Sequence, residues 1–222
     1  EELIKIISSY DGLIVRSATK VTSDVIEAAT NLKVIGRAGI GVDNIDVAAA
    51  GKKGIIVMNT PEGNVITTAE HAMALMLSMS RNIPQARSML KDQKTWAPKK
   101  FIGKELHCKT LGIVGLGRIG TIVAHRAKGF HMKVLVHDPF ISKEYAEKVG
   151  VEVVDLPELL KQSDYLSLHT PSLDGKPLLS TKEFNMAKPG IRIVNCARGN
   201  LIDESALIEA IKTKQVAQAA LD

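Results

Sequence analysis

Cysteine and long apolar runs are both scarce in this sequence of 222 residues. The only cysteines are Cys108 and Cys196, too few and too far apart for a disulfide framework or a zinc site. We therefore expect structural thiols, no metal site and a reducing, cytoplasmic compartment. The longest apolar run, residues 72–77, falls far short of the roughly 18 residues that a bilayer-spanning helix needs. No basic-then-apolar leader is visible, and we expect no membrane partner and no export signal.

Aromatic residues are also few, at 4% with a single Trp, and this bears on the positive charge of the chain. Lys and Arg outnumber Asp and Glu by 29 to 24, and the pI is near 9.1. The basic residues are dispersed, and the densest short cluster is Lys99, Lys100 and Lys104. Without a basic patch that carries aromatics or a reading helix, we expect no nucleic-acid partner. A mild positive charge suits small anionic ligands.

The sequence predicts an α/β protein, because short β-rich runs alternate with helical stretches along the whole chain. In the first part, strands are expected at 12–16, 33–36 and 55–59. A long helical pattern then runs from about residue 65 past 80, with residues 66, 69, 73, 76 and 77 on one apolar face. Three strands in about 90 residues do not make an independent covered sheet. We therefore expect a partial, flavodoxin-like substrate domain that lacks residues at its N-terminus, and a chain that is a fragment at both ends.

The second part predicts a complete doubly wound parallel sheet, the Rossmann fold. Six strands are expected, at 110–115, 133–138, 151–155, 164–169, 191–195 and 216–221. Ile83-Pro84 and the polar stretch 91–104 interrupt the helical pattern before this unit begins. The predicted domains are 1–95 and 96–222.

A glycine-rich turn follows the first of these six strands. Residues 115–120 read GLGRIG, with glycines at Gly115, Gly117 and Gly120, and a helical pattern opens directly after them. This context points backbone N–H groups and the helix dipole at a pyrophosphate, which is typical of dinucleotide binding. At Arg118 two readings stay open: the guanidinium reaches the pyrophosphate, or it is a plain surface residue.

Asp138 ends the next predicted strand, 18 positions beyond Gly120. A carboxylate there accepts both adenosine ribose hydroxyls of NAD and repels the 2'-phosphate of NADP, so NAD is the favoured cofactor. The alternative is a turn with a solvated Asp before Pro139.

Arg198 follows the fifth strand of the second part, at the edge where ligands bind in open α/β sheets. A guanidinium there can clamp a substrate carboxylate and polarise the adjacent carbonyl during hydride transfer. The alternative is an ion pair with Asp203 or Glu204. Oxidising an alcohol also needs a base, and of six histidines only His169 follows a strand end. It is more simply read as a residue that shapes the cofactor pocket, so the expected acid/base is missing.

Several motifs in order resemble the D-isomer-specific 2-hydroxyacid dehydrogenases, most closely those that act on 3-phosphoglycerate. The resemblance covers essentially all 222 residues. It is carried by 12–19 (GLIVRSAT), 36–44 (GRAGIGVDN), 59–61 (NTP), the turn at 115–120, 169–171 (HTP), 194–199 (VNCARG), Asp203-Glu204 and 220–222 (ALD).

The resemblance implies NAD-dependent oxidation of 3-phosphoglycerate to 3-phosphohydroxypyruvate, in serine biosynthesis, by a homo-oligomer (a dimer or a tetramer). It implies that Arg198 is the catalytic residue and binds the substrate carboxylate, and that Arg16 and Arg37 bind the anionic substrate. The polar stretch with Trp96 resembles a segment that pairs subunits. The implied cofactor contacts are Gly115, Gly117, Arg118, Ile119, Gly120, Asp138, Thr170, Cys196, Ala197 and Asp222.

Three departures from the family pattern stand beside the resemblance. The family's catalytic Glu and His both lie after the strand that ends this sequence, so we expect the fragment alone to be inactive. Ile40 stands where relatives often carry Thr, and Glu62 where close relatives often carry Asn. Two alternatives therefore stay open: a dehydrogenase of another 2-hydroxy acid such as glycerate (or hydroxypyruvate in reverse), and an NAD-responsive binding module of the corepressor type.

Overall fold

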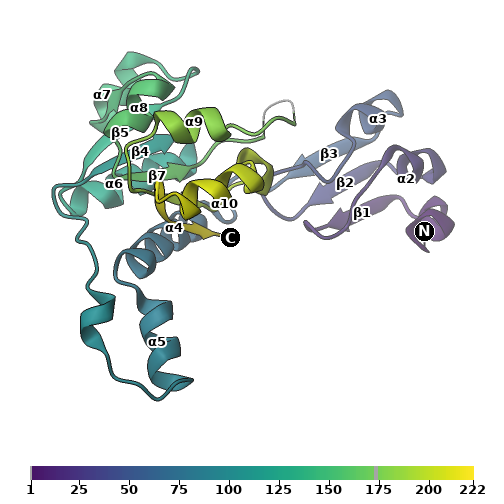
Figure 1. The fold of residues 1–222 in the computed structure, drawn as a ribbon. Coiled ribbons are helices and arrows are strands. Elements are labelled where there is room, and N and C mark those ends of the chain that lie inside the picture. Colours follow the sequence, from purple (N-terminus) through teal and green to yellow (C-terminus); the bar gives the residue numbers. More distant parts are fainter. Residues whose placement is uncertain (1, 173–174) are drawn as a thin grey trace. The chain divides into compact units, whose positions relative to one another are not determined.

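The computed structural model describes residues 2–172 and 175–222. The chain forms two compact units, Glu1–Val65 and Ile66–Asp222 (Figure 1), and each is described by itself. The sequence placed the division near residue 95. It lies after Val65 in the structure, because helix α4 (Val65–Ser80) packs into the second unit's core through Ala69, Met73 and Met76. Within the described ranges, no helix has the length and apolar character needed to cross a membrane.

The first unit contains a three-stranded parallel sheet in the order β1-β2-β3. All three strands were predicted, to within a residue or so at each end: β1 (Gly12–Val15), β2 (Val34–Arg37) and β3 (Ile56–Asn59). The helical segments of this unit are α1 (Glu2–Ile6), η1 (Ile7–Ser9), α2 (Ser23–Ala28) and α3 (Val47–Lys52).

Only one face of the three-stranded sheet is buried. Ile35 at the centre of β2 is fully buried against α2 and α3 residues such as Ile26 and Ala50. Alternation along the strand puts the neighbouring positions on the opposite face, where Ile14 pairs with Gly36. Ile14 is 83% exposed and Met58 is 56% exposed. The first unit therefore has a core on one side of its sheet and an uncovered apolar surface on the other.

The second unit contains a six-stranded parallel sheet in the order β6-β5-β4-β7-β8-β9. Numbered along the chain, this is the 3-2-1-4-5-6 order of the doubly wound dinucleotide fold, so the predicted fold class is confirmed. The strands are β4 (Thr110–Val114), β5 (Lys133–His137), β6 (Glu152–Val153), β7 (Tyr165–Leu168), β8 (Ile191–Asn195) and β9 (Val216–Leu221).

Helices cover both faces of this sheet. One core joins α4 and α6 (Arg118–Gly129) to strand residues such as Leu111 and Ile113. The other joins α8 (Leu156–Gln162), α9 (Thr181–Met186) and α10 (Glu204–Lys212) to residues such as Val114 and Leu166. Ile66, expected on the apolar face of α4, is 58% exposed instead. Two further elements of this unit are α7 (Lys143–Val149) and η3 (Gly199–Leu201).

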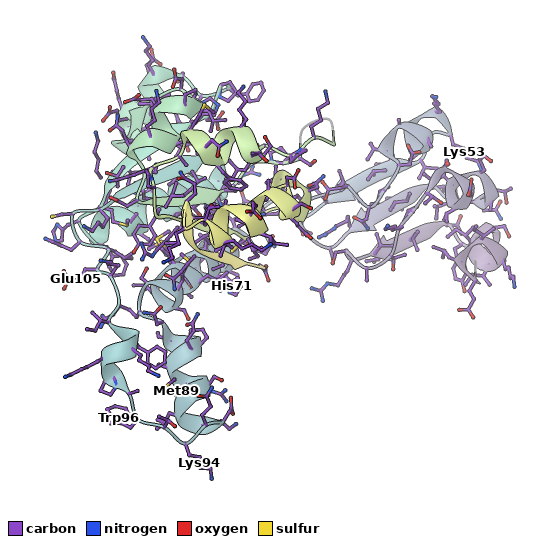
Figure 2. The ribbon with its side chains drawn as sticks, viewed as in Figure 1. Lys53, His71, Met89, Lys94, Trp96 and Glu105 are labelled. Atoms are coloured by element: carbon purple, nitrogen blue, oxygen red, sulfur yellow. The ribbon has the colours of Figure 1, made fainter. Side chains whose placement is uncertain are left out.

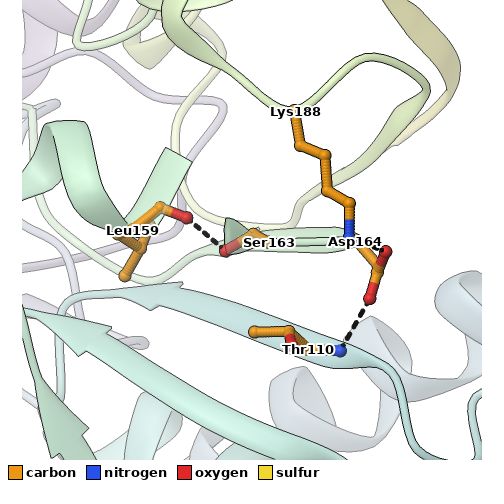
Figure 3. Close-up of polar contacts among 5 residues, drawn as sticks. All are labelled: Thr110, Leu159, Ser163, Asp164 and Lys188. Atoms are coloured by element: carbon orange, nitrogen blue, oxygen red, sulfur yellow. Dashed lines mark hydrogen bonds and ion pairs between the residues drawn. The ribbon is translucent and has the colours of Figure 1, made fainter. Parts of the chain in front are cut away.

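A polar network fixes the start of β7 against its neighbours (Figure 3). The Asp164 carboxylate accepts hydrogen bonds from the Thr110 N–H at 2.9 Å and from Lys188 Nζ at 2.7 Å. Burial opposes ionisation of Asp164, but these two bonds outweigh it and hold its pKa below the ordinary value. The Ser163 hydroxyl bonds the Leu159 carbonyl at the end of α8.

An extended arm, residues 83–101, separates α4 from β4. It consists of α5 (Ile83–Lys91) and η2 (Pro98–Phe101), and neither element contains a buried residue. Figure 2 shows it projecting away from the sheet of the same unit, with Trp96 near its tip. Trp96 is 76% exposed, and Leu90 and Ile102 are also exposed. The sequence predicted only an interruption here, since Ile83-Pro84 was read as a helix breaker; Pro84 instead lies in the first turn of α5, where its missing N–H costs nothing.

Candidate active site

The carboxyl ends of the second unit's strands carry most of the predicted site residues. Strands β4 and β7 are neighbours in the sheet and lead to helices on opposite faces, so the chain order reverses between them. A pocket of about 230 Å³ opens at this point, lined by Gly115, Asp138, Phe140, His169 and Thr170 among others. In open α/β sheets this is the place where ligands bind.

The turn between β4 and α6 requires glycine at two positions. Gly115 has φ +92°, and a Cβ there would lie 2.7 Å from the His169 carbonyl oxygen. A Cβ at Gly120 would lie 2.0 Å from the Gly115 carbonyl oxygen. At Gly117, by contrast, a Cβ would meet nothing within 4 Å, so this glycine borders open space. Gly115 and Gly120 serve packing, while Gly117 leaves room for a ligand to approach the backbone.

The first turn of α6 presents its N-terminus at the turn. Gly117 is the N-cap residue, and no side chain caps the helix. Arg118 is exposed and Ile119 is half-buried in this first turn. A helix of 12 residues with uncapped N–H groups favours an anion at this end. The turn therefore fits the pyrophosphate of a dinucleotide.

Asp138 lies directly beyond β5, next to the turn. Its Oδ2 accepts a hydrogen bond from the Leu116 N–H at 2.8 Å, and its Oδ1 accepts one from the Phe140 N–H at 2.9 Å. A carboxylate accepts about four hydrogen bonds, so both oxygens keep acceptor capacity for the two hydroxyls of a ribose. Its charge disfavours a phosphate at the same place.

His169 lines the pocket as a neutral ring. Its Nε2 lies 2.8 Å from Oγ of the buried Ser167, and burial lowers the pKa of the ring to about 4. Such a ring is a weak base at neutral pH. The structure therefore agrees with the simpler reading of His169 as a residue that shapes the pocket. Its neighbour Thr170, also half-buried, lines the pocket as well.

The loop after β8 is shaped by the buried Asn195. Its side-chain oxygen accepts the Ala197 N–H at 2.9 Å, and its Nδ2 donates to the Arg198 carbonyl at 2.8 Å. Arg198 Nη1 donates to the Ala197 carbonyl at 2.9 Å, and the side chain is half-buried. The loop thus presents Arg198 from a rigid strand end. Asn195 was not selected from the sequence, although it precedes the Cys-Ala-Arg segment.

Cys196 and Asp222 lie close together at the ends of β8 and β9. Burial and the negative charge of Asp222 raise the pKa of the Cys196 thiol to about 11, so it is protonated at neutral pH. Cys196 is therefore not a nucleophile here. The Asp222 N–H donates to the Asn195 carbonyl at 3.0 Å, and its carboxylate lies 3.7 Å from His71 Nε2 of α4.

Arg16 directly follows β1 and Arg37 ends β2, so both lie at the carboxyl edge of the sheet in the first unit. They line a pocket of about 460 Å³ together with Gly39, Thr60 and Asn64. Arg37 donates from Nη1 to the Ala38 carbonyl, while its buried Nε has no hydrogen-bond partner within residues 2–172 and 175–222. A Cβ at Gly39, which has φ +151°, would lie 1.4 Å from Arg37 Nη1. A pocket lined by two guanidinium groups suits an anion.

The structure separates the predicted residues into two groups. The cofactor residues and Arg198 lie along one edge of the second unit, and Arg16 and Arg37 lie in the first. Phe140 is exposed and lines the pocket with Asp138. Sequence reasoning missed it, because the only feature in the sequence that indicates a site residue there is its position just after a strand end. Over the described part of the chain, no group of three or more His, Cys, Asp or Glu could hold a metal ion.

Comparison with known proteins identifies this architecture. Residues 73–222 match the protein-family model of the D-isomer specific 2-hydroxyacid dehydrogenase NAD binding domain. A curated relative from Archaeoglobus fulgidus, D-3-phosphoglycerate dehydrogenase, is 53% identical over all of this chain and 42% of its own length. The chain thus spans less than half the length of the curated relatives it matches.

Two solved structures resemble the chain over nearly its whole length. D-lactate dehydrogenase from Aquifex aeolicus, complexed with NAD and lactic acid, is 30% identical with a TM-score of 0.90, over 99% of this chain and 66% of that one. An acyclic imino acid reductase (Bsp5), in complex with NADPH and D-Arg, is 35% identical with a TM-score of 0.88, over 100% of this chain and 71% of that one.

Proposed function

The chain belongs to the D-isomer specific 2-hydroxyacid dehydrogenase family, and from this premise we propose that its protein oxidises 3-phosphoglycerate to 3-phosphohydroxypyruvate with NAD. This reaction belongs to serine biosynthesis. The matched NAD binding domain and the relatives of about 50% identity support the proposal. When bound, NAD supplies the nicotinamide that accepts the hydride leaving C2 of the hydroxy acid.

One observation carries the choice of a phosphorylated substrate. The first unit holds an anion pocket with Arg16 and Arg37, in addition to Arg198 in the second unit. A hydroxy acid without a phosphate needs one guanidinium for its carboxylate, whereas 3-phosphoglycerate has a second anion to neutralise. We assign the carboxylate to Arg198, which also polarises the forming C2 carbonyl, and the phosphate to the pocket of Arg16 and Arg37.

The proton of the C2 hydroxyl needs a base, and His169 is not suited to that role. His169 is bonded to Ser167 and has a pKa of about 4. The 222-residue chain by itself is therefore expected to bind NAD without turning over a 2-hydroxy acid. Rapid NADH production by this chain alone would assign the base to a residue within it.

The substrate assignment is tested in the complete protein with 3-phosphoglycerate and D-glycerate. We expect Arg37→Gln to lower kcat/KM for 3-phosphoglycerate by roughly 30-fold or more and that for D-glycerate by less than about 3-fold. Arg198→Ala should lower kcat/KM for both substrates, because both have the carboxylate. A wild-type preference for D-glycerate would support the other 2-hydroxy acid, and NADH binding without any turnover would support a binding module.

The cofactor assignment is tested by Asp138→Ala. Loss of the carboxylate should weaken NAD binding by roughly ten-fold or more and narrow the preference over NADP. Calorimetry measures the affinities for both dinucleotides. NADP is included because the similar imino acid reductase was solved in complex with NADPH. Equal affinities before and after the change would exclude a ribose contact for Asp138.

We place the protein in the cytoplasm as a homo-oligomer. Both cysteines are free thiols, which suits a reducing compartment. The exposed Leu90 and Trp96 of the arm, and Ile102 directly after it, suit a contact between subunits. Light scattering of the wild-type protein and of Trp96→Ala tests the assembly, and a monomeric wild-type protein would contradict it.

A further inference from the structure

Both peptide groups of Leu116, in the middle of the glycine-rich turn, are hydrogen-bonded by side chains. The Leu116 N–H donates to Asp138 Oδ2 at 2.8 Å, and the Leu116 carbonyl accepts from Thr121 Oγ1 at 3.2 Å. The Leu116 side chain is buried, which fixes the residue from a third direction. The turn is thus held in one conformation by groups outside it.

The bond from Thr121 continues to helix α7. Tyr145 Oη lies 2.9 Å from Thr121 Oγ1. A hydroxyl has a single hydrogen, and that of Thr121 points to the Leu116 carbonyl, so Tyr145 is the donor of the second bond. The Tyr145 N–H in turn donates to Oγ of Ser142, the N-cap residue of α7. A directed chain of bonds therefore runs from Tyr145 through Thr121 to Leu116.

We propose that Tyr145 and Thr121 are positioning residues for the dinucleotide diphosphate. They hold the turn of Gly115 to Gly117 in the conformation that leaves the first N–H groups of α6 available. The entropic cost of ordering the turn when the diphosphate binds is therefore lower. Tyr145 lies 28 residues beyond Gly117 and outside the glycine motif. The inference rests on the proposed use of NAD, because it concerns the same turn.

The serial arrangement makes a specific prediction about paired substitutions. Tyr145 acts on the turn only through Thr121, so Tyr145→Phe should have no further effect once Thr121→Val has removed the connecting hydroxyl. If Tyr145 contacted the diphosphate itself, the two effects would add. Additive losses would therefore overturn the proposal.

The experiment uses the 222-residue chain and measures NADH binding by its fluorescence, with ADP and adenosine as displacing ligands. Tyr145→Phe and Thr121→Val should each weaken NADH and ADP binding by roughly three- to ten-fold. Adenosine, which has no phosphate, should change by less than about two-fold, since the turn's amides do not bind it. Thr121→Ser keeps the hydroxyl and should restore ADP binding.

A matched control is Thr213→Val. Like Thr121, Thr213 donates from Oγ1 to a backbone carbonyl, that of Glu209, but it lies at the C-cap of α10. It should leave ADP binding unchanged. An equal loss of ADP and adenosine binding in the Thr121 and Tyr145 variants, or no loss of either, overturns the positioning role while the unaltered chain still binds NADH. Failure of the unaltered chain to bind NADH overturns the proposed function as well.

Discussion

The two sheets of this chain are built by the same rule and end in different states. Both are parallel, and both present arginine at the carboxyl ends of their strands. In the second unit helices bury both faces, and β4 and β7 are almost fully buried. In the first unit one face is a core and the other exposes Ile14 and Met58. A sheet can therefore form without helices on both of its faces. In the described residues, the sheet of the second unit is packed on both faces and that of the first unit on one.

The largest expected effect tests whether the three-stranded sheet has a single core face. Ile35→Ala removes a fully buried side chain and should cost the first unit about 2–5 kcal/mol of unfolding free energy. Ile14→Ala, on the neighbouring strand but on the exposed face, should cost less than about 0.5 kcal/mol. Hydrogen exchange of peptides from β1 to β3 measures both variants. Similar losses would mean that both faces are packed.

The second prediction concerns close packing in the six-stranded unit. Gly120→Ala places a Cβ 2.0 Å from a backbone oxygen and should destabilise this unit by about 3 kcal/mol and abolish NAD binding. Gly129→Ala in the same helix meets nothing within 4 Å and serves as the control, with unchanged or slightly higher stability. Exchange in β1 to β3 should remain at the wild-type rate in both. Tolerance of Gly120→Ala would contradict the geometry of the turn.

The third prediction separates the units by pH, because all six histidines lie in the second. Burial lowers the pKa of His169 to about 4 from an ordinary 6.5, so the unfolded chain binds the extra proton first. Stability from this group is complete above pH 6.5 and is lost as the pH falls towards 4. Between pH 7 and 5 the second unit should lose roughly 2 kcal/mol. His169→Gln should remove this dependence, and a pH-independent wild-type stability would argue against a neutral His169 ring.

The smallest expected effect compares one carboxylate in each unit. Asp164→Asn breaks the bond to Lys188 and should cost the second unit about 1 kcal/mol near neutral pH. Because the pKa of Asp164 lies below its ordinary value, this contribution is present above about pH 4 and is lost as the pH falls further. Asp11→Asn breaks an exposed pair with Lys33 and should leave the urea midpoint of the first unit unchanged. Equal shifts would mean that burial does not distinguish the pairs.

Local pattern was enough to predict most of the fold. The nine strands of the described ranges, 2–172 and 175–222, all lie where β-rich runs were predicted, since alternating and continuous apolar runs report burial directly. The long helix α4 was also expected, but its membership of the second unit was not. An apolar helical face in the sequence does not indicate which sheet the helix will cover. The arm shows the same limit, because a proline in the first turn of α5 reads in sequence as a break.

The candidate site divides in a similar way. Gly115, Gly120, Asp138 and Arg198 could be selected from the sequence because each occupies a defined place next to a strand end. Phe140, Thr121 and Tyr145 could not, since their roles depend on contacts with residues distant in sequence. His169 needed the structure for another reason: only the surrounding atoms and Ser167 decide its protonation state.

Sequence by itself determined the order of strands and helices, the glycine turn and the carboxylate that follows the next strand, because these depend on periodicity and on backbone conformations that only certain residues tolerate. Tertiary structure alone decided which helix covers which sheet, which face of the first sheet stays open, and which hydroxyls hold the turn. Those outcomes depend on the packing of segments far apart in the chain, where distance and burial, and not residue type, set the strength of an interaction.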